Sequence, residues 1–410
     1  MVFDYGVIGG GPAGYTVAMM FAKAGKKVVL FEQDKLGGTC LNKGCIPTKS
    51  ILHSSEIYRE VVKTAPELGL DIEVKSFDFK KVADKKNKAV EKIRKALELA
   101  VKNSGVNIVY EKANVKDKST VFAGDEEYKV NEIIVATGAK PKEIRGLEFD
   151  SEFILSSDDV LNLNSLPKSV LIVGSGAIGI EWARIFSNFG VEVSVVEMAE
   201  HLIPLADIDV SKRIERIFKQ RKIKFYLNDC VSNIKNRSVE LRSGAVINPD
   251  FVLVAIGRVP LKTDLDLVSI GDACGEIQLA HYAMHQAKSL ACGIDFDKKL
   301  TPSVIYGEPE IAWVGIREQD CDEDCKSVTL PITALGKSWC DDSIDGFIKF
   351  IIKDEYIVGA HIVSKEASAL IHEVLIAIQN RITIDELKKT CFAHPTYSEG
   401  IFDLLMSVVR

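Results

Sequence analysis

Two cysteines near the start of the chain, Cys40 and Cys45, lie in a glycine-rich segment with four residues between them. Thiols this close can carry two electrons, because they can form and break a disulfide with each other. The alternative chemistry is zinc binding, which requires further ligands at matching spacing. No C-x-x-C motif or histidine cluster is found nearby, so we expect a redox pair and no metal site.

An internal repeat suggests a second kind of chemistry. Two glycine-rich turns, at residues 9–14 and 174–179, each follow a short apolar segment and precede a helical pattern. A second apolar segment then ends in an acidic residue, Glu32 or Glu197, 23 positions after the first glycine of its turn. This is the order of a dinucleotide-binding unit, in which glycines allow the turn, the approach of a pyrophosphate and the packing of helix on strand.

We therefore expect two dinucleotide sites. In each, the helix N-terminus faces the phosphates and the glutamate accepts hydrogen bonds from ribose hydroxyls. The motif residues that we assign to binding are Gly9, Gly11, Pro12, Ala13, Gly14 and Glu32 in the first copy and Gly174, Gly176, Ala177, Ile178, Gly179 and Glu197 in the second.

His394 is the candidate acid–base group. With an ordinary pKa near 6.5, an imidazole can take a proton from a thiol at neutral pH, and the carboxylate of Glu399 could orient the ring. The alternative is that residues 393–399 only begin the last helix, with His394 packed on Pro395.

The elements that position these residues indicate an α/β fold with two doubly wound, Rossmann-like domains. Apolar segments at 133–136 and 252–256 close the two units, and a third, at 267–270, is expected to return to the first domain. From about residue 301 a hairpin (347–352 and 356–363) and helices (367–379, 384–390 and 398–408) indicate a separate α+β domain. We predict a first domain of residues 1–139 and 267–298, a second of 140–266 and a third of 299–410.

Composition excludes several other classes of protein. The 410 residues carry a net charge of -6, which argues against a nucleic-acid surface. No apolar run is long enough to span a membrane, and the first strand begins too early to leave room for a targeting peptide. Nine irregularly spaced cysteines favour a reducing compartment, so we expect a cytoplasmic protein.

Residues 37–49 resemble the redox-active motif of the class I flavoprotein disulfide reductases. Their Leu-Asn and Ile-Pro-Thr-Lys sequences are most similar to the motif of the dihydrolipoamide dehydrogenases. Residues 136–138, 174–179, 257–258, 271–272 and 393–399 extend the resemblance along the chain. It implies FAD in the first unit, NAD in the second and a C-terminal domain that forms a homodimer.

The resemblance also implies residue roles. Cys45 would lie beside the flavin, Cys40 would exchange with the dithiol substrate, and Lys49 and Glu181 would form an ion pair near the flavin. His394 and Glu399 would act in the active site of the partner subunit, and the charge of Glu197 would select NAD by repelling a 2′-phosphate. Further implied contacts are Gly38, Thr39, Lys49, Ala113, Ala136, Thr137, Gly138, Asp272 and Ala280 for FAD, and Val231 and Gly257 for NAD.

The expected activity is NAD-dependent oxidation of dihydrolipoamide carried by a lipoyl protein of a 2-oxoacid dehydrogenase or glycine-cleavage complex. The alternatives are reduction of another small or protein disulfide on the same scaffold, and a paralogue without turnover. The chain is short for the family between Pro260 and Gly271, and Leu261 stands where the motif usually has asparagine. Cys321 and Cys325 are expected to be ordinary thiols.

Overall fold

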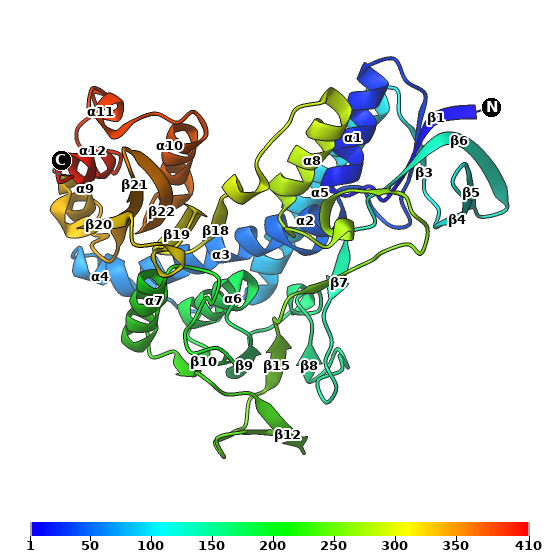
Figure 1. Ribbon diagram of the computed structural model, residues 1–410. Coiled ribbons are helices and arrows are strands. Elements are labelled where there is room, and N and C mark those ends of the chain that lie inside the picture. The colour runs from blue at the N-terminus through cyan, green and yellow to red at the C-terminus, as the bar shows by residue number, and fades with distance from the viewer. Residues whose placement is uncertain (1, 409–410) are drawn as a thin grey trace.

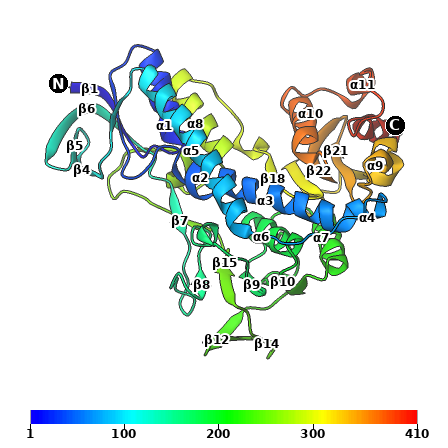
Figure 2. The same ribbon diagram turned by 180° about the vertical axis from the view of Figure 1, so that it is seen from behind.

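The computed structural model describes residues 2–408, whose helices and strands gather around three sheets of five or more strands (Figure 1). Each of these sheets occupies a different region of the molecule, and the long helix α3 (Cys45–Arg59) runs between the regions. In Figure 2, α3 reaches from α2 (Gly38–Lys43) to α4 (Ala65–Glu67). The chain segment that contains both cysteines therefore begins in the first region and leads toward the last.

The first sheet has β1 (Val2–Ile8) at its centre, with parallel strands β2 and β3 on one side and β6 on the other. Strand β17 joins β6 in parallel through two residue pairs, and β4 and β5 extend the sheet in antiparallel fashion. Helices α1 and α8 pack against each other (Figures 1 and 2). The bounds are β2 (Val28–Phe31), β3 (Asn107–Val109), β4 (Ala113–Asp117), β5 (Thr120–Ala123), β6 (Glu126–Val135), β17 (Val268–Ser269), α1 (Pro12–Lys23), α5 (Phe79–Asn103) and α8 (Ala280–Cys292).

The second sheet repeats the plan of the first. Its parallel strands follow the order β11-β10-β9-β15-β8. The strand before the glycine turn, β9, therefore lies between β10 and β15. A small antiparallel sheet, β12-β13-β14, extends from it. The bounds are β8 (Ile154–Leu155), β9 (Ser169–Val173), β10 (Glu192–Val196), β11 (Lys224–Tyr226), β12 (Val231–Lys235), β13 (Ser238–Leu241), β14 (Val246–Ile247), β15 (Phe251–Val254), α6 (Ala177–Asn188) and α7 (Ile208–Gln220).

The third sheet is antiparallel throughout, in the order β18-β19-β22-β21-β20. Its apolar face packs with α10 and α12 around a separate core that includes Phe350, Ile371 and Tyr397. The bounds are β18 (Ser303–Ile305), β19 (Glu310–Gly315), β20 (Cys325–Pro331), β21 (Phe347–Lys353), β22 (Tyr356–Ser364), α9 (Gly336–Cys340), α10 (Ala367–Gln379), α11 (Ile384–Leu387) and α12 (Glu399–Met406).

Most of the expected elements are found, with differences at their ends. The hairpin is confirmed as β21 and β22, and the helix expected at 367–379 is α10. The helix expected at 384–390 ends at Leu387, and the strand expected at 267–270 is limited to the two residues of β17. A capping box between Thr383 and Glu386 starts α11, but only one turn follows it.

The fold class is the one expected, two Rossmann-like α/β units and a C-terminal α+β unit. The exact domain limits stay a proposal. The pairing of β17 with β6 and the packing of α8 on α1 support assigning residues 267–298 to the first domain. A two-stranded ladder of β7 (Ala139–Pro141) and β16 (Arg258–Pro260) connects the first two units.

An ion cluster around the buried Lys349 joins the second unit to the third. The Lys349 ammonium on β21 is 1% exposed and lies 2.8 Å from Asp207, 2.7 Å from Asp209 and 2.5 Å from Glu318. These three carboxylates converge closely enough to hold a cation, and the lysine side chain takes that place. The three carboxylates raise the pKa of Lys349 against the opposing effect of burial.

We expect Lys349→Met to destabilise the folded protein by about 3–5 kcal/mol, because the change leaves the fully buried Asp207 without its cation. Lys353→Met is the matched control. Its ion pair with Asp322 is largely exposed and screened by solvent, so its loss should change the stability far less. Urea unfolding of both variants measures the difference, and equal effects would contradict the assigned role of Lys349.

Candidate active site

The glycine-rich turns after β1 and β9 have the same backbone geometry. Gly9 and Gly174 have φ angles of +102° and +99°. A Cβ atom would lie 2.3 Å from the carbonyl oxygen of Ala136 at the first position and 2.7 Å from that of Ala255 at the second. Glycine is therefore required at both turns, by backbone angle and by the closeness of the next strand.

The third glycine of each motif allows helix and strand to approach. A Cβ atom at Gly14 would lie 1.8 Å from the carbonyl oxygen of Gly9, and one at Gly179 would lie 2.0 Å from that of Gly174. The helices α1 and α6 consequently start directly behind the turns. Their unpaired N–H groups are available to a pyrophosphate, as the motif predicts.

The space beside each helix start is free. The Cβ position of Gly176 has no heavy atom within 4 Å, and that of Gly11 has only the Cα of Gly38, at 3.8 Å. Gly38 itself has a φ of +54° and comes so close to Gly11 that a Cβ would lie 2.7 Å from its Cα. Gly11, Gly38 and the start of α1 thus form a cradle that a phosphate group can enter.

The two predicted ribose-binding glutamates make equivalent contacts with backbone N–H groups. Glu32 accepts from the backbone N–H of Gly10 and from the N–H two residues beyond itself, both at 2.8 Å. Glu197 accepts from the N–H of Ser175 at 2.8 Å and from the N–H two residues on at 2.9 Å. Glu197 Oε2 also accepts from the Ser175 hydroxyl at 2.7 Å. Each glutamate still keeps acceptor capacity on Oε1, so both can also bind ribose hydroxyls.

Asp272 follows the short strand β17 and is partly buried. Burial raises the pKa of its carboxyl group, and the Arg258 charge opposes that effect. Because a buried carboxylate needs hydrogen-bond donors, Asp272 fits the predicted contact with a hydroxyl of the FAD chain. The N–H of the preceding residue, Gly271, donates to Gln286 Oε1 at 2.7 Å.

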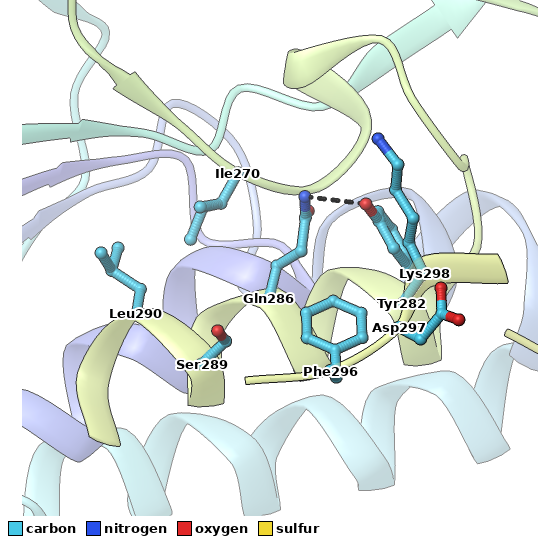
Figure 3. Close-up of a pocket in the computed structure, with 8 residues that line it drawn as sticks. All are labelled: Ile270, Tyr282, Gln286, Ser289, Leu290, Phe296, Asp297 and Lys298. Carbon is cyan, nitrogen blue, oxygen red and sulfur yellow. Dashed lines mark hydrogen bonds between the residues drawn. The ribbon is translucent and has the colours of Figure 1, made fainter. Parts of the chain in front are cut away.

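Gln286 also lines a cavity of about 460 Å³ next to α8 (Figure 3). In the figure its side chain points toward Tyr282, to whose hydroxyl it donates at 3.2 Å. Phe296 and Lys298 contribute from the segment after α8. The cavity thus borders the Gly271–Asp272 turn, but none of the predicted site residues lines it.

Arg258 was expected only as part of a motif, and the structure gives it contacts that the motif did not indicate. Its guanidinium donates to the carbonyl oxygen of Ala139 at 2.7 Å and lies 3.4 Å from Thr39 Oγ1. It also lies 3.5 Å from Asp158. Arg258 therefore ties the residue next to Cys40 to the ladder between the first two units.

The remaining predicted cofactor residues lie at the ends of strands and helices. Their assignments stay predictions. Ala136, Thr137 and Gly138 follow β6, Ala113 begins β4, Ala280 begins α8, Val231 begins β12 and Gly257 follows β15.

The two cysteines lie on consecutive helices, Cys40 in α2 and Cys45 at the first position of α3. The two thiols shift each other's pKa in opposite directions. Cys40 lowers the pKa of Cys45 to about 7, helped by the charge of Lys49. Cys45 raises the pKa of Cys40 well above its ordinary value, together with burial. When the pair loses one proton, the negative charge therefore lies on Cys45 and the remaining proton on Cys40.

Lys49 and Glu181 form the ion pair that the resemblance implied. The ammonium lies 2.8 and 2.7 Å from the two carboxylate oxygens, and Glu181 is only 5% exposed. Lys49 is four residues after Cys45 on α3, so it shares the face of the helix that bears the thiol.

Two residues that the sequence did not indicate hold this ion pair in place. The N–H of Tyr306 donates to Glu181 at 3.1 Å, and its ring lies 4.8 Å from the Lys49 nitrogen. Its carbonyl oxygen accepts from the buried Arg184 at 3.0 Å. Arg184 is three residues after Glu181, so helical spacing places both on one face of α6, whereas no pattern near Tyr306 indicated its role.

His394 and Glu399 are joined by a hydrogen bond of 2.8 Å between Nδ1 and Oε1. The other carboxylate oxygen of Glu399 accepts from the N–H of Thr396 at 2.8 Å, and these contacts lower the pKa of Glu399. The imidazole is 77% exposed, and within the described chain it contacts neither cysteine. Both views show α12 well apart from α2 (Figures 1 and 2).

The chain belongs to the pyridine nucleotide-disulphide oxidoreductase family. The family model matches residues 3–283, and the model of the family's dimerisation domain matches residues 301–404. The second match supports a homodimer.

Similar proteins bear the name dihydrolipoyl dehydrogenase. The chain is 32% identical to one from Chlamydia pneumoniae, over 97% of this chain and 95% of that protein. It is 31% identical to one from Bacillus subtilis, over 97% and 96% of the two chains. The first alignment runs over 439 residues, more than the 410 of this chain, so that relative contains residues that this chain lacks.

Two solved structures share the fold over nearly their whole length. LpdA from Mycobacterium tuberculosis has a TM-score of 0.90 at 23% identity, with 99% of this chain and 100% of that one covered. The HOCl-induced flavoprotein disulfide reductase RclA from Escherichia coli has a TM-score of 0.87 at 24% identity, covering 99% and 100%.

The protein is thus a flavoprotein oxidoreductase that uses FAD and NAD(H). The structure fits both groups, since the two glycine turns leave open space beside helix N-termini and each has its glutamate at the strand end. No helix among residues 2–408 is long and apolar enough to cross a membrane.

Proposed function

We propose that the protein oxidises dihydrolipoyl groups to lipoyl groups and reduces NAD. The feature that carries the proposal is the asymmetric pair of Cys40 and Cys45 at the start of α3, in which the pKa of Cys45 is lowered and that of Cys40 is raised. The relatives named dihydrolipoyl dehydrogenase support the choice of substrate. Bound FAD supplies a two-electron acceptor between the cysteine pair and NAD.

The asymmetry determines which sulfur a substrate thiolate attacks. A thiol of low pKa is the better leaving group, so attack on the Cys40–Cys45 disulfide occurs at Cys40 and releases Cys45 as a thiolate. The second substrate sulfur then attacks the substrate sulfur bound to Cys40. The lipoyl disulfide leaves, and both cysteines are reduced.

Each substrate thiol must lose a proton before it attacks. His394 is assigned to take it, because Glu399 accepts from one ring nitrogen and leaves Nε2 free. The ring is exposed and distant from the cysteines of its own chain, which supports its acting on the cysteines of a second copy. The proposed homodimer therefore contains two composite sites.

A lipoyl-bearing protein of a 2-oxoacid dehydrogenase or glycine-cleavage complex is the proposed partner. The exposed imidazole suits a substrate delivered on a long arm from another protein. We also propose that the protein works in the cytoplasm, where the reducing conditions suit nine unpaired cysteines.

A steady-state assay of the purified holoenzyme tests the proposal. We expect turnover with dihydrolipoamide and NAD, and much less with glutathione disulfide and either NADH or NADPH. The reverse preference would indicate that the protein reduces another disulfide substrate. No turnover with any of these substrate and coenzyme pairs, although FAD is bound, would favour a paralogue without turnover.

Coenzyme choice provides a separate prediction. Glu197→Arg removes the charge that repels a 2′-phosphate and supplies a partner for it. We expect the ratio of kcat/KM for NAD over NADP to fall by a factor of ten or more, about 1.4 kcal/mol per factor. Glu192→Arg is the control, since it makes the same charge change at the exposed start of β10. An unchanged ratio in Glu197→Arg would show that this glutamate does not face the ribose.

A further inference from the structure

The ion pair of Lys49 and Glu181 lies where the three units meet. Lys49 is on α3, Glu181 is on α6 of the second unit, and Tyr306 directly follows β18 of the third. The Tyr306 N–H donates to Glu181 at 3.1 Å, and its ring lies 4.8 Å from the Lys49 nitrogen. One residue of the third unit therefore contacts both members of the pair.

A buried arginine fixes the position of Tyr306. Arg184 is 1% exposed, and its Nη1 donates to the Tyr306 carbonyl oxygen at 3.0 Å. Arg184 lies three residues after Glu181, on the same face of α6. The N–H and the carbonyl group of Tyr306 are thus bound by two side chains from one turn of one helix, which closes a ring of contacts.

The residue after Tyr306 leaves room for the guanidinium. Gly307 has a φ of +130°, and a Cβ atom there would lie 2.7 Å from both Cδ and Nη1 of Arg184. Glycine is therefore required by the backbone angle and by the closeness of the arginine. The turn has its present shape only if Arg184 and Gly307 are both present.

The charge of Arg184 is balanced by carboxylates on three elements. Those on α6, α3 and β19 belong to Glu181, Glu56 and Glu310, and the charge of Arg221 on the segment after α7 opposes them. Burial lowers the pKa of Arg184 only to about 9, so the side chain is charged at neutral pH.

Stability alone does not account for this arginine. Within residues 2–408, its Nε and Nη2 have no hydrogen-bond partner. Burying a charged group whose donors are incompletely satisfied destabilises the folded state. The contact with Tyr306 therefore marks a role in the neighbouring site.

We propose that Arg184, acting through Tyr306, is a positioning residue for the ion pair one helical turn from Cys45. The contact holds the Tyr306 N–H against Glu181, so the carboxylate divides its hydrogen bonding between this donor and the Lys49 ammonium. The inference rests on the proposed redox role of the cysteine pair, but not on dihydrolipoamide as the substrate.

The direction of the expected effect follows from the charges around the Cys45 thiol. Lys49 lowers the pKa of Cys45, and Glu181 raises it. Without Arg184, one positive charge is lost and Glu181 loses its second donor, so both changes should raise the pKa of Cys45. The other titratable groups that face the cysteine pair stay unchanged, and they are Tyr15 on α1, Cys40 on α2 and Tyr306.

The pH dependence of the thiolate absorbance in the reduced holoenzyme tests the proposal. Reduction with one equivalent of dithionite makes the measurement independent of any dithiol substrate. We expect the midpoint for Arg184→Met to lie roughly 0.5 to 1 pH unit above that of the parent. Arg184→Lys keeps the charge and a donor for the Tyr306 carbonyl group, so it should restore most of the difference.

Arg221→Met is the matched control, because Arg221 binds the same turn without a contact to the ion pair. Its Nη2 donates to the Glu308 carbonyl oxygen at 2.5 Å and its Nη1 to Asn188 Oδ1 at 3.3 Å. The variant loses a charge and a contact with the turn, yet its midpoint should equal that of the parent. An equal shift in Arg221→Met and Arg184→Met would mean general loosening of the turn and would overturn the positioning role.

Gly307→Ala gives a second variant, which decides the matter if Arg184→Met does not fold. The added Cβ crowds Arg184 away from Tyr306 without changing any charge, so the midpoint should again move upward. A parent protein without the absorbance would refute the proposed redox pair. A parent with the absorbance, together with unchanged midpoints in Arg184→Met and Gly307→Ala, would refute the positioning role alone.

Discussion

Cys45→Ser should lower dithiol turnover on the order of 10³-fold or more and remove the long-wavelength absorbance that a thiolate beside bound flavin produces on two-electron reduction. Cys40→Ser should also lose turnover, but because it cannot form the disulfide, it should show that absorbance with oxidised flavin before any reductant is added. The reason is that the pKa of Cys45 is lowered to about 7, whereas that of Cys40 is raised.

The same assignment predicts a pH dependence. A thiol with a lowered pKa is charged above that value, so the absorbance of the reduced parent should be present above about pH 7 and disappear below it. The loss of the Cys40 contact should shift the midpoint upward in Cys40→Ser. An absorbance that survives in Cys45→Ser and disappears in Cys40→Ser would reverse the two roles.

His394→Ala should lower turnover on the order of 10²-fold or more, because substrate thiols then lack their proton acceptor. When it is mixed and refolded with Cys45→Ser, activity should return. A hybrid dimer contains one site with Cys45 from one chain and His394 from the other, both intact.

The control is His372→Ala, which changes an exposed histidine on α10 that bonds to a backbone carbonyl group of its own helix. The His372→Ala protein should keep full activity by itself, without being mixed with Cys45→Ser. Hybrid dimers that form but stay as inactive as both parents would show that His394 does not act across the subunit interface.

The repeat was the part of the fold that the sequence predicted best. Glycine spacing reports on backbone angles, and the structure shows why: Gly9 and Gly174 need positive φ, and Gly14 and Gly179 have carbonyl oxygens where a Cβ would be. Such requirements are local, so a pattern of residue types is enough to reveal them.

Contacts between units could not be predicted in the same way. Lys349 lies in an otherwise apolar strand. Its carboxylate partners include Glu318, 31 residues away in the sequence, and Asp207, 142 residues away. Tyr306 acts through its backbone N–H and carbonyl groups, which any residue type has. Neither role leaves a pattern in the neighbouring residues.

The cysteines show both situations. A glycine-rich motif marked Cys40 and Cys45, but their opposite pKa shifts depend on the start of α3 and on Lys49.

Anaerobic rapid mixing of the oxidised holoenzyme with one equivalent of dihydrolipoamide tests the central claim most directly. The proposed function predicts that the thiolate absorbance appears within one turnover time and that added NAD then removes it, with one NADH formed per subunit. If dihydrolipoamide leaves the spectrum unchanged while NADH produces the same absorbance, the redox pair works but dihydrolipoamide is not its substrate.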